Sequence, residues 1–173
     1  MIFLRHPVTD AGDGVCYGQL DLGLGDGADA QIASALATTP RPTDIRSSDL
    51  FRAQMLAEKV AARDGLDITF DKRLREYDFG AWEGRRWSEI PRSEWEPWSN
   101  DLWGASPPGG ENFADLHARV GAAIADCTPR TLVVAHAGVI RAAMMILNGK
   151  SFDEVFATKI PFCQPITLMA EAA

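Results

Sequence analysis

Two arginines and two histidines follow predicted strands, at positions from which they could bind one anion together. Arg5 and His6 follow a short apolar run at the start of the chain, Arg52 comes a few residues after the predicted second strand, and His136 follows the buried run TLVVA. Guanidinium groups bind phosphate oxygens bidentately, so these side chains suit a dianionic tetrahedral group. A neutral histidine among them can attack phosphorus, because nearby positive charge disfavours its protonated form. The residue types therefore indicate phosphate binding and permit phosphoryl transfer.

Phosphoryl transfer through histidine also needs an acid that protonates the departing alkoxide. The segment LREYDFGAWEG offers three carboxyl groups, those of Glu76, Asp78 and Glu83. Their spacing alone does not rank them, so all three stay candidates at this point. Thr9 lies three residues after His6, and we expect its hydroxyl to donate to the same phosphate.

The elements that must position these residues follow from the apolar patterns. Strands are predicted at 1–4, 43–48, 66–70, 131–135 and 165–170, and helices at 28–39, 49–65, 111–127 and from the turn after His136 to Gly149. Strands that alternate with helices predict an α/β fold, a three-layer α/β/α sandwich with a mostly parallel central sheet. In such sheets ligands bind beyond the carboxyl ends of the strands, which is where the arginines and histidines fall. We predict a single domain over 1–173, in which 76–110 is an irregular insertion near the site that holds all five tryptophans.

Composition argues against several classes of protein. The net charge of −7 disfavours nucleic acid or an anionic membrane as the main partner. The chain has no apolar run of bilayer length and does not begin like a secretory signal, so we expect a cytoplasmic protein. Cys16, Cys127 and Cys163 are too scattered for a disulfide framework, and three dispersed histidines make a poor zinc site. We therefore expect no metal and no cofactor, and a small phosphate ester as the ligand; the oligomeric state stays open.

The motifs resemble those of the histidine phosphatase superfamily, also called the phosphoglycerate mutase-like family. The matching stretches, in the family's order, are LRHPVT, RSSDLFRA, LREYDFGAWEG and LVVAHAGVIR. The resemblance implies a phosphoglycerate mutase-like fold and a metal-independent phosphomonoesterase that forms phosphohistidine. It implies these roles: His6 as nucleophile, Glu76 as proton donor, and Arg5, Arg52 and His136 as phosphate binders. Within the superfamily, GVCYGQLDLGL, WEGRRWSEI and PPGGENF resemble the α-ribazole phosphatases of cobalamin synthesis, which implies α-ribazole 5′-phosphate as the substrate.

Three positions depart from the family's pattern, so we consider alternatives to a specific phosphatase. Pro7 replaces a glycine and supplies no N–H, Gly12 stands where an asparagine is expected, and Ala137 replaces a glycine. Pro7 and Gly12 favour a non-catalytic phosphate-binding module. A broad-specificity phosphatase and a phosphoglycerate mutase-like enzyme also stay open, although the short chain and its few basic loop residues favour a phosphatase.

Several of these residues also have purely structural explanations. Arg52 could pair with Asp49 on its own helix, and His136 could be a core histidine with satisfied hydrogen bonds. The four motifs in order favour the site roles. For most of the tryptophans we expect simple packing, with Trp82 or Trp87 as the candidate to stack on an aromatic leaving group.

Overall fold

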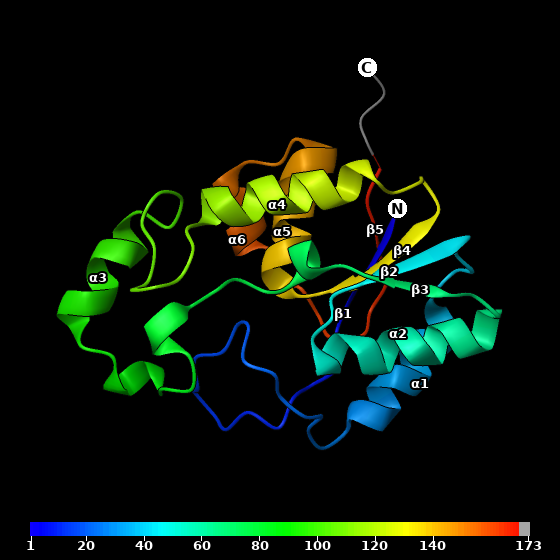
Figure 1. Cartoon of the computed structure of the whole chain (residues 1–173), viewed down its shortest axis with the longest axis horizontal. Coiled ribbons are helices and arrows are strands. Elements are labelled where there is room, and N and C mark those ends of the chain that lie inside the picture. Colours follow the sequence, from blue (N-terminus) through cyan, green and yellow to red (C-terminus); the bar gives the residue numbers. More distant parts are fainter. Residues whose placement is uncertain (170–173) are drawn as a thin grey trace.

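A five-stranded sheet lies between two layers of helices in the computed structural model, which describes residues 1–169 (Figure 1). The strands are β1 (Ile2–Arg5), β2 (Asp44–Ser47), β3 (Ile68–Phe70), β4 (Thr131–Ala135) and β5 (Ile166–Thr167), in the order β3-β2-β4-β1-β5. The first four strands pair with one another in parallel, and β5 pairs antiparallel with β1. The predicted α/β sandwich with a mostly parallel sheet is therefore confirmed. The predicted last strand is shorter than expected, and its residue 170 lies outside the described residues.

Helices cover both faces of the sheet because β1 and β4 alternate their buried side chains. Ile2, Leu4, Leu132 and Val134 pack on one face, against α1 (Ala28–Thr38) and α2 (Phe51–Asp64). Phe3 and Val133 pack on the other face, against α4 (Phe113–Ala125), α5 (Ala137–Asn148) and α6 (Phe152–Ala157). Strands buried on both faces read as continuous apolar runs, as IFL and TLVVA do. Within residues 1–169, no helix combines the length and apolarity that crossing a membrane requires.

The register of the sheet brings three strand ends to one edge. Arg5 of β1 pairs with Ala135 of β4, and Ser47 of β2 pairs with Val134 of β4. The next residues continue these ladders, since the His6 N–H donates to the Ala135 carbonyl at 3.0 Å and the Ser48 N–H donates to the Val134 carbonyl at 3.0 Å. The residues that follow β1, β2 and β4 are thereby held side by side.

The tryptophan-rich segment 76–110 is more regular than the sequence predicted. It contains the short 3-10 turns Gly80–Trp82 and Trp87–Glu89 and the nine-residue helix α3 (Arg92–Asn100), which lies to one side of the sheet in Figure 1. Pro97 lies inside α3, and an internal proline weakens the helical signal of a sequence. The segment packs around its own small core of Cys16, Trp82 and Ile90.

Helix α6 was also missed, although its sequence carries a start signal. The Ser151 hydroxyl accepts the Glu154 N–H at 3.4 Å, and the Glu154 carboxylate accepts the Ser151 N–H at 2.8 Å. This reciprocal pair is a capping box, which the spacing SFDE encodes. The first 3-10 turn, Lys72–Leu74, follows β3 and leads into the segment that carries Glu76.

Candidate active site

His6 is held in one tautomer at the end of β1. Its side chain is buried, and its Nδ1 lies 2.7 Å from the Pro7 carbonyl oxygen. A carbonyl oxygen only accepts, so Nδ1 carries the hydrogen and the neutral ring leaves Nε2 with a free lone pair. Burial, followed by the positive charges of Arg52 and Arg5, holds the pKa of His6 well below its ordinary value. The lowered pKa favours the neutral ring at physiological pH, with Nε2 free.

His136 lies beside His6, with the ring centres 5.0 Å apart. It is fully buried at the N-cap position of α5, and its Nε2 lies 2.9 Å from the Ser48 hydroxyl. Its Nδ1 is buried and has no hydrogen-bond partner within residues 1–169. Burial, then the neighbouring His6 and Arg52, holds the pKa of His136 well below its ordinary value. The unpartnered Nδ1 disfavours the alternative of a core histidine with satisfied hydrogen bonds.

Arg5 points from β1 toward the segment that follows α6. Its guanidinium donates to the Ile160 carbonyl at 2.8 Å, and its Cζ lies 3.8 Å from the centre of the Phe162 ring. The same Phe162 ring lies 5.5 Å from the His6 ring, so it packs against both members of the Arg-His pair. The Nε of Arg5 is buried and unpartnered among the described residues.

Arg52 lies fully buried on the first turn of α2. Its guanidinium donates to the Leu20 carbonyl at 2.8 Å and to the Gly18 carbonyl, which fixes the loop before α1 against the site. The alternative pairing with Asp49 is wrong, because Asp49 forms a two-bond ion pair with Arg75 at 2.6 and 2.7 Å. We name Arg5, His6, Arg52 and His136 the strand-end cluster.

The structure separates the three candidate carboxylates. Glu76 accepts the Gly138 N–H at 3.0 Å, at the start of α5 and close to the arginines. Asp78 accepts the N–H of Gly80 at 2.8 Å within its own turn. Glu83 accepts the backbone N–H groups of residues 19 and 20 at 2.8 and 2.5 Å and so holds their loop. Of the three, Glu76 is the one that lies against α5 beside the strand-end cluster.

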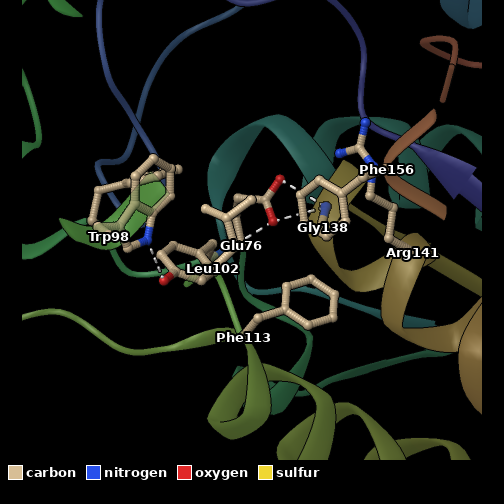
Figure 2. A pocket seen from close by; sticks show the side chains of 9 residues that line it. Glu76, Trp98, Leu102, Phe113, Gly138, Arg141 and Phe156 are labelled. Carbon is tan, nitrogen blue, oxygen red and sulfur yellow. Dashed lines mark hydrogen bonds between the residues drawn. The ribbon is translucent and has the colours of Figure 1, made fainter. Parts of the chain in front are cut away.

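The Glu76 carboxylate lies at the start of α5. The Gly138 N–H, in the first turn of that helix, donates to Glu76 (Figure 2). Burial lowers the pKa of Arg5, Arg52 and Arg141, and the nearby Glu76 carboxylate opposes that lowering in all three. Glu76 is thus the acidic member of a cationic site.

The remaining predicted position, Thr9, lies on the loop after β1. It is buried, and its backbone forms a bridge with Leu24. No hydrogen bond of its hydroxyl occurs within residues 1–169, so its role toward phosphate stays a prediction. At the exposed Gly12, a Cβ would meet Val15 Cγ2 at an ordinary 3.7 Å, so the backbone leaves room for a side chain at this position.

Glu76 also borders a cavity of about 470 Å³ that has aromatic walls (Figure 2). We name it the aromatic cavity; its lining residues are Glu76, Tyr77, Phe79, Trp98, Leu102, Phe113, Gly138, Arg141 and Phe156. Trp82, proposed from the sequence to stack on a leaving group, is fully buried elsewhere, and Trp87 borders a different cavity. The tryptophan that lines the aromatic cavity is Trp98.

Arg141 joins this cavity to a second, cationic one. That cavity measures about 960 Å³ and is lined by Arg5, Arg141, Lys159, Gln31, Ser34 and residues 160–164, none of them acidic. Arg141 was given no role from the sequence, and nothing in its position on a predicted helix distinguished it. Within residues 1–169, no group of three or more His, Cys, Asp or Glu side chains is placed to hold a metal ion.

Comparison with known proteins agrees with this geometry. Residues 1–170 match the family model of the histidine phosphatase superfamily (branch 1). Proteins of Salmonella paratyphi B and Salmonella newport, each named "Probable phosphoglycerate mutase GpmB", are 42% identical over 103 residues, which make up 54% of this chain and 47% of theirs. The matched region thus spans about half the length of these curated relatives.

Two solved structures resemble the whole chain. A mycobacterial glucosyl-3-phosphoglycerate phosphatase is 31% identical, with a TM-score of 0.78 over 92% of this chain and 84% of that one. The α-ribazole phosphatase of Shigella flexneri is 24% identical, with a TM-score of 0.85 over 95% of this chain and 87% of that one. The second likeness concerns the fold.

Proposed function

Because this chain belongs to the histidine phosphatase superfamily, we propose that it is a metal-independent phosphomonoesterase that works through phosphohistidine. The observation that carries the proposal is the state of His6. Its Nδ1 is tied to the Pro7 carbonyl and its pKa is depressed, so Nε2 is free to attack. Pro7, a departure from the family's pattern, supplies through its carbonyl the contact that selects this tautomer.

In the first step, Nε2 of His6 forms a bond to phosphorus while the bond from phosphorus to the ester oxygen breaks. Arg5 and Arg52 stabilise the charge on the equatorial oxygens, which is the main catalytic requirement of phosphoryl transfer. In this mechanism the Ser48 hydroxyl donates to Nε2 of neutral His136, so Nδ1 carries the hydrogen. The Nδ1–H then donates to a phosphate oxygen. Such an arrangement uses the buried nitrogen that otherwise has no partner.

Glu76 acts on the leaving group. Its carboxyl gives a proton to the departing alkoxide, and in the second step the carboxylate takes a proton from the water that attacks the phosphohistidine. The Gly138 and Tyr77 N–H groups, at 3.0 and 2.9 Å, orient the carboxyl group toward the arginines. Asp78 holds its own turn and Glu83 holds the loop at residues 19 and 20, whereas Glu76 lies against the start of α5 near the arginines, which supports Glu76 as the acid.

The substrate that we favour is α-ribazole 5′-phosphate or a similar small phosphate ester. Support comes from the three stretches that resemble α-ribazole phosphatases and from the fold shared with the Shigella flexneri enzyme. The mycobacterial phosphatase and the mutase names among the relatives keep a broad-specificity phosphatase and a mutase-like enzyme as alternatives. A non-catalytic phosphate-binding module is disfavoured, since His6 and Glu76 are both placed for chemistry.

The test is phosphate release from p-nitrophenyl phosphate and α-ribazole 5′-phosphate in excess chelator, for the wild type and His6→Ala. We expect turnover by the wild type and a loss of at least about 10³-fold in the variant, because the nucleophile is removed. Better hydrolysis of the ribazole ester supports that substrate, and turnover of the nitrophenyl ester alone leaves only the broad-specificity phosphatase. Binding of phosphate without turnover would establish the non-catalytic module instead.

A further inference from the structure

We propose that the aromatic cavity holds the leaving group, so that the preferred substrates are phosphate monoesters whose leaving group carries a flat apolar ring, as that of α-ribazole 5′-phosphate does, rather than a bare sugar or a carboxylate. This inference rests on the proposed function, because it places the departing oxygen at Glu76. It goes beyond that function by assigning the recognition site and the chemical class that it selects.

The walls of the cavity come from segments far apart in the sequence. Tyr77 and Phe79 precede the 3-10 turn, Trp98 lies on α3, Phe113 begins α4 and Phe156 lies on α6. Their rings also contact one another: the Tyr77 and Phe79 centres are 4.8 Å apart, and those of Phe113 and Phe156 are 5.3 Å apart in an edge arrangement. The walls are therefore preformed by their own packing, and offer flat faces and ring edges to a ligand.

The aromatic walls offer few hydrogen-bonding groups. The Trp98 indole N–H already donates to the Tyr77 hydroxyl at 2.9 Å, a bond drawn in Figure 2. An indole has no other donor, so along these walls the Tyr77 O–H is the side-chain donor that is left. A polyhydroxylated leaving group would lose more hydrogen bonds to water than these walls replace, which disfavours its binding.

The two charged groups of the cavity, Glu76 and Arg141, lie on either side of Gly138. Figure 2 shows Trp98 on the other side of Glu76 from Arg141. A carboxylate that paired with Arg141 would lie beside the Glu76 carboxylate and would leave the aromatic walls unfilled. An ester oxygen at Glu76 instead lets an apolar body extend along the walls.

The first experiment compares three primary alkyl monoesters: 3-phenylpropyl phosphate, n-propyl phosphate and glycerol 3-phosphate. The two propyl alcohols are similarly acidic, so the rate difference between their esters reports recognition rather than bond cleavage. Glycerol is the stronger acid, so slower hydrolysis of its ester cannot come from a poorer leaving group. We expect kcat/KM for the phenyl ester to exceed that for each of the others by about 10- to 100-fold, mainly through KM.

Substitutions then locate the preference. Phe156→Ala and Trp98→Ala should each remove most of the ratio between phenylpropyl and propyl phosphate. The matched controls are Phe70→Ala, at a residue outside the cavity that is exposed to a similar degree (46% against 38% for Phe156), and Trp95→Ala, which lies on α3 outside the cavity. Both controls should keep the ratio. Phe156 is partly exposed, so its variant is expected to fold even if that of Trp98 does not.

The outcomes separate this inference from the proposed function. If the enzyme hydrolyses the three esters equally well, the inference is overturned and the proposed phosphatase activity still holds. The same conclusion follows if Phe156→Ala and Trp98→Ala both keep the ratio of kcat/KM between phenylpropyl and propyl phosphate. If no ester is hydrolysed, the proposed function fails, and equilibrium binding of 3-phenylpropyl and n-propyl phosphate decides the inference by itself. Tighter binding of the phenyl ester that Phe156→Ala abolishes supports it, and equal binding overturns it.

Discussion

The strand-end cluster and the aromatic cavity adjoin at Glu76, but different forces hold them in place. In the cluster, side chains are fixed by directional bonds to the backbone, from Arg5 to Ile160, from Arg52 to the loop before α1, and from the His6 ring to Pro7. In the cavity, rings from four segments hold one another mainly by contact. We therefore expect the cluster to govern the chemical step for every ester, and the cavity to govern which ester binds.

Glu76 belongs to both regions, and its replacement should have the largest effect of the changes considered below. Glu76→Gln keeps an oxygen for the Gly138 N–H but removes the acid, so kcat for an alkyl phosphate should fall by about 10²- to 10⁴-fold. For p-nitrophenyl phosphate, whose leaving group needs no proton, the fall should be much smaller. The control is Asp78→Asn, which keeps the bond to Gly80 and should lose little. Equal losses for both esters would contradict the acid role.

Arg52→Gln tests the cluster itself. Loss of a guanidinium that stabilises the transition state should lower kcat/KM for all esters alike by about 10²- to 10³-fold. It should also raise the pKa of His6, because Arg52 is the largest charge that depresses it after burial. Kinetics and an NMR titration of the His6 ring provide the two measurements, with Arg46→Gln, on β2 and bonded to Asp126, as the control. A loss confined to one ester would place Arg52 in substrate selection instead.

The strand-end cluster could be predicted from the sequence because its geometry follows from the sheet. Apolar runs locate β1 and β4, and parallel strands of one sheet end at a common edge, so Arg5, His6 and His136 had to converge. The choice of Glu76 came from the resemblance, since local spacing cannot distinguish it from Asp78. The bond that selects its position, from the Gly138 N–H, joins segments 62 residues apart.

The aromatic cavity could not be predicted in the same way. Its walls include residues of α3 and α6, two helices that the apolar patterns do not predict. Its walls also depend on contacts between rings that have no fixed spacing in the sequence. Composition indicated that most of the tryptophans pack in the protein, and Trp82 does so. It could not indicate that Trp82 is buried while Trp98 faces the cavity, because that depends on how α3 lies against Tyr77 and Phe79.

Gly138→Ala should disturb the boundary between the two regions without changing a charged group. A Cβ at this position would lie 2.4 Å from Glu76 Oε1, so the carboxyl group must move. We expect alkyl phosphate hydrolysis to fall by about 10- to 100-fold, with a smaller fall for p-nitrophenyl phosphate, as misplacement of a catalytic group predicts. Gly121→Ala on α4 is the matched control, since its Cβ would meet Ile146 at 3.7 Å. Unchanged alkyl ester kinetics in Gly138→Ala would show that the position of Glu76 is not critical.

The smallest effect concerns stability, and it should come from the cluster rather than from the aromatic walls. The pKa values of His6 and His136 are well below 6.5 in the folded protein, mainly through burial. As the pH falls below about 6.5, the unfolded chain gains protons that these folded rings do not, so each ring lowers the free energy of unfolding by at most about 1.4 kcal/mol per pH unit. The loss stops once the pH falls below the folded pKa.

Urea unfolding at pH 7.5 and 5.5 measures this loss in the free energy of unfolding. His136→Asn should reduce the pH dependence more than His117→Asn, because His117 is only partly buried. If the two variants keep the same pH dependence as the wild type, His136 takes up a proton in the folded protein as readily as in the unfolded chain. It cannot then serve the cluster as the neutral phosphate ligand of the proposed mechanism.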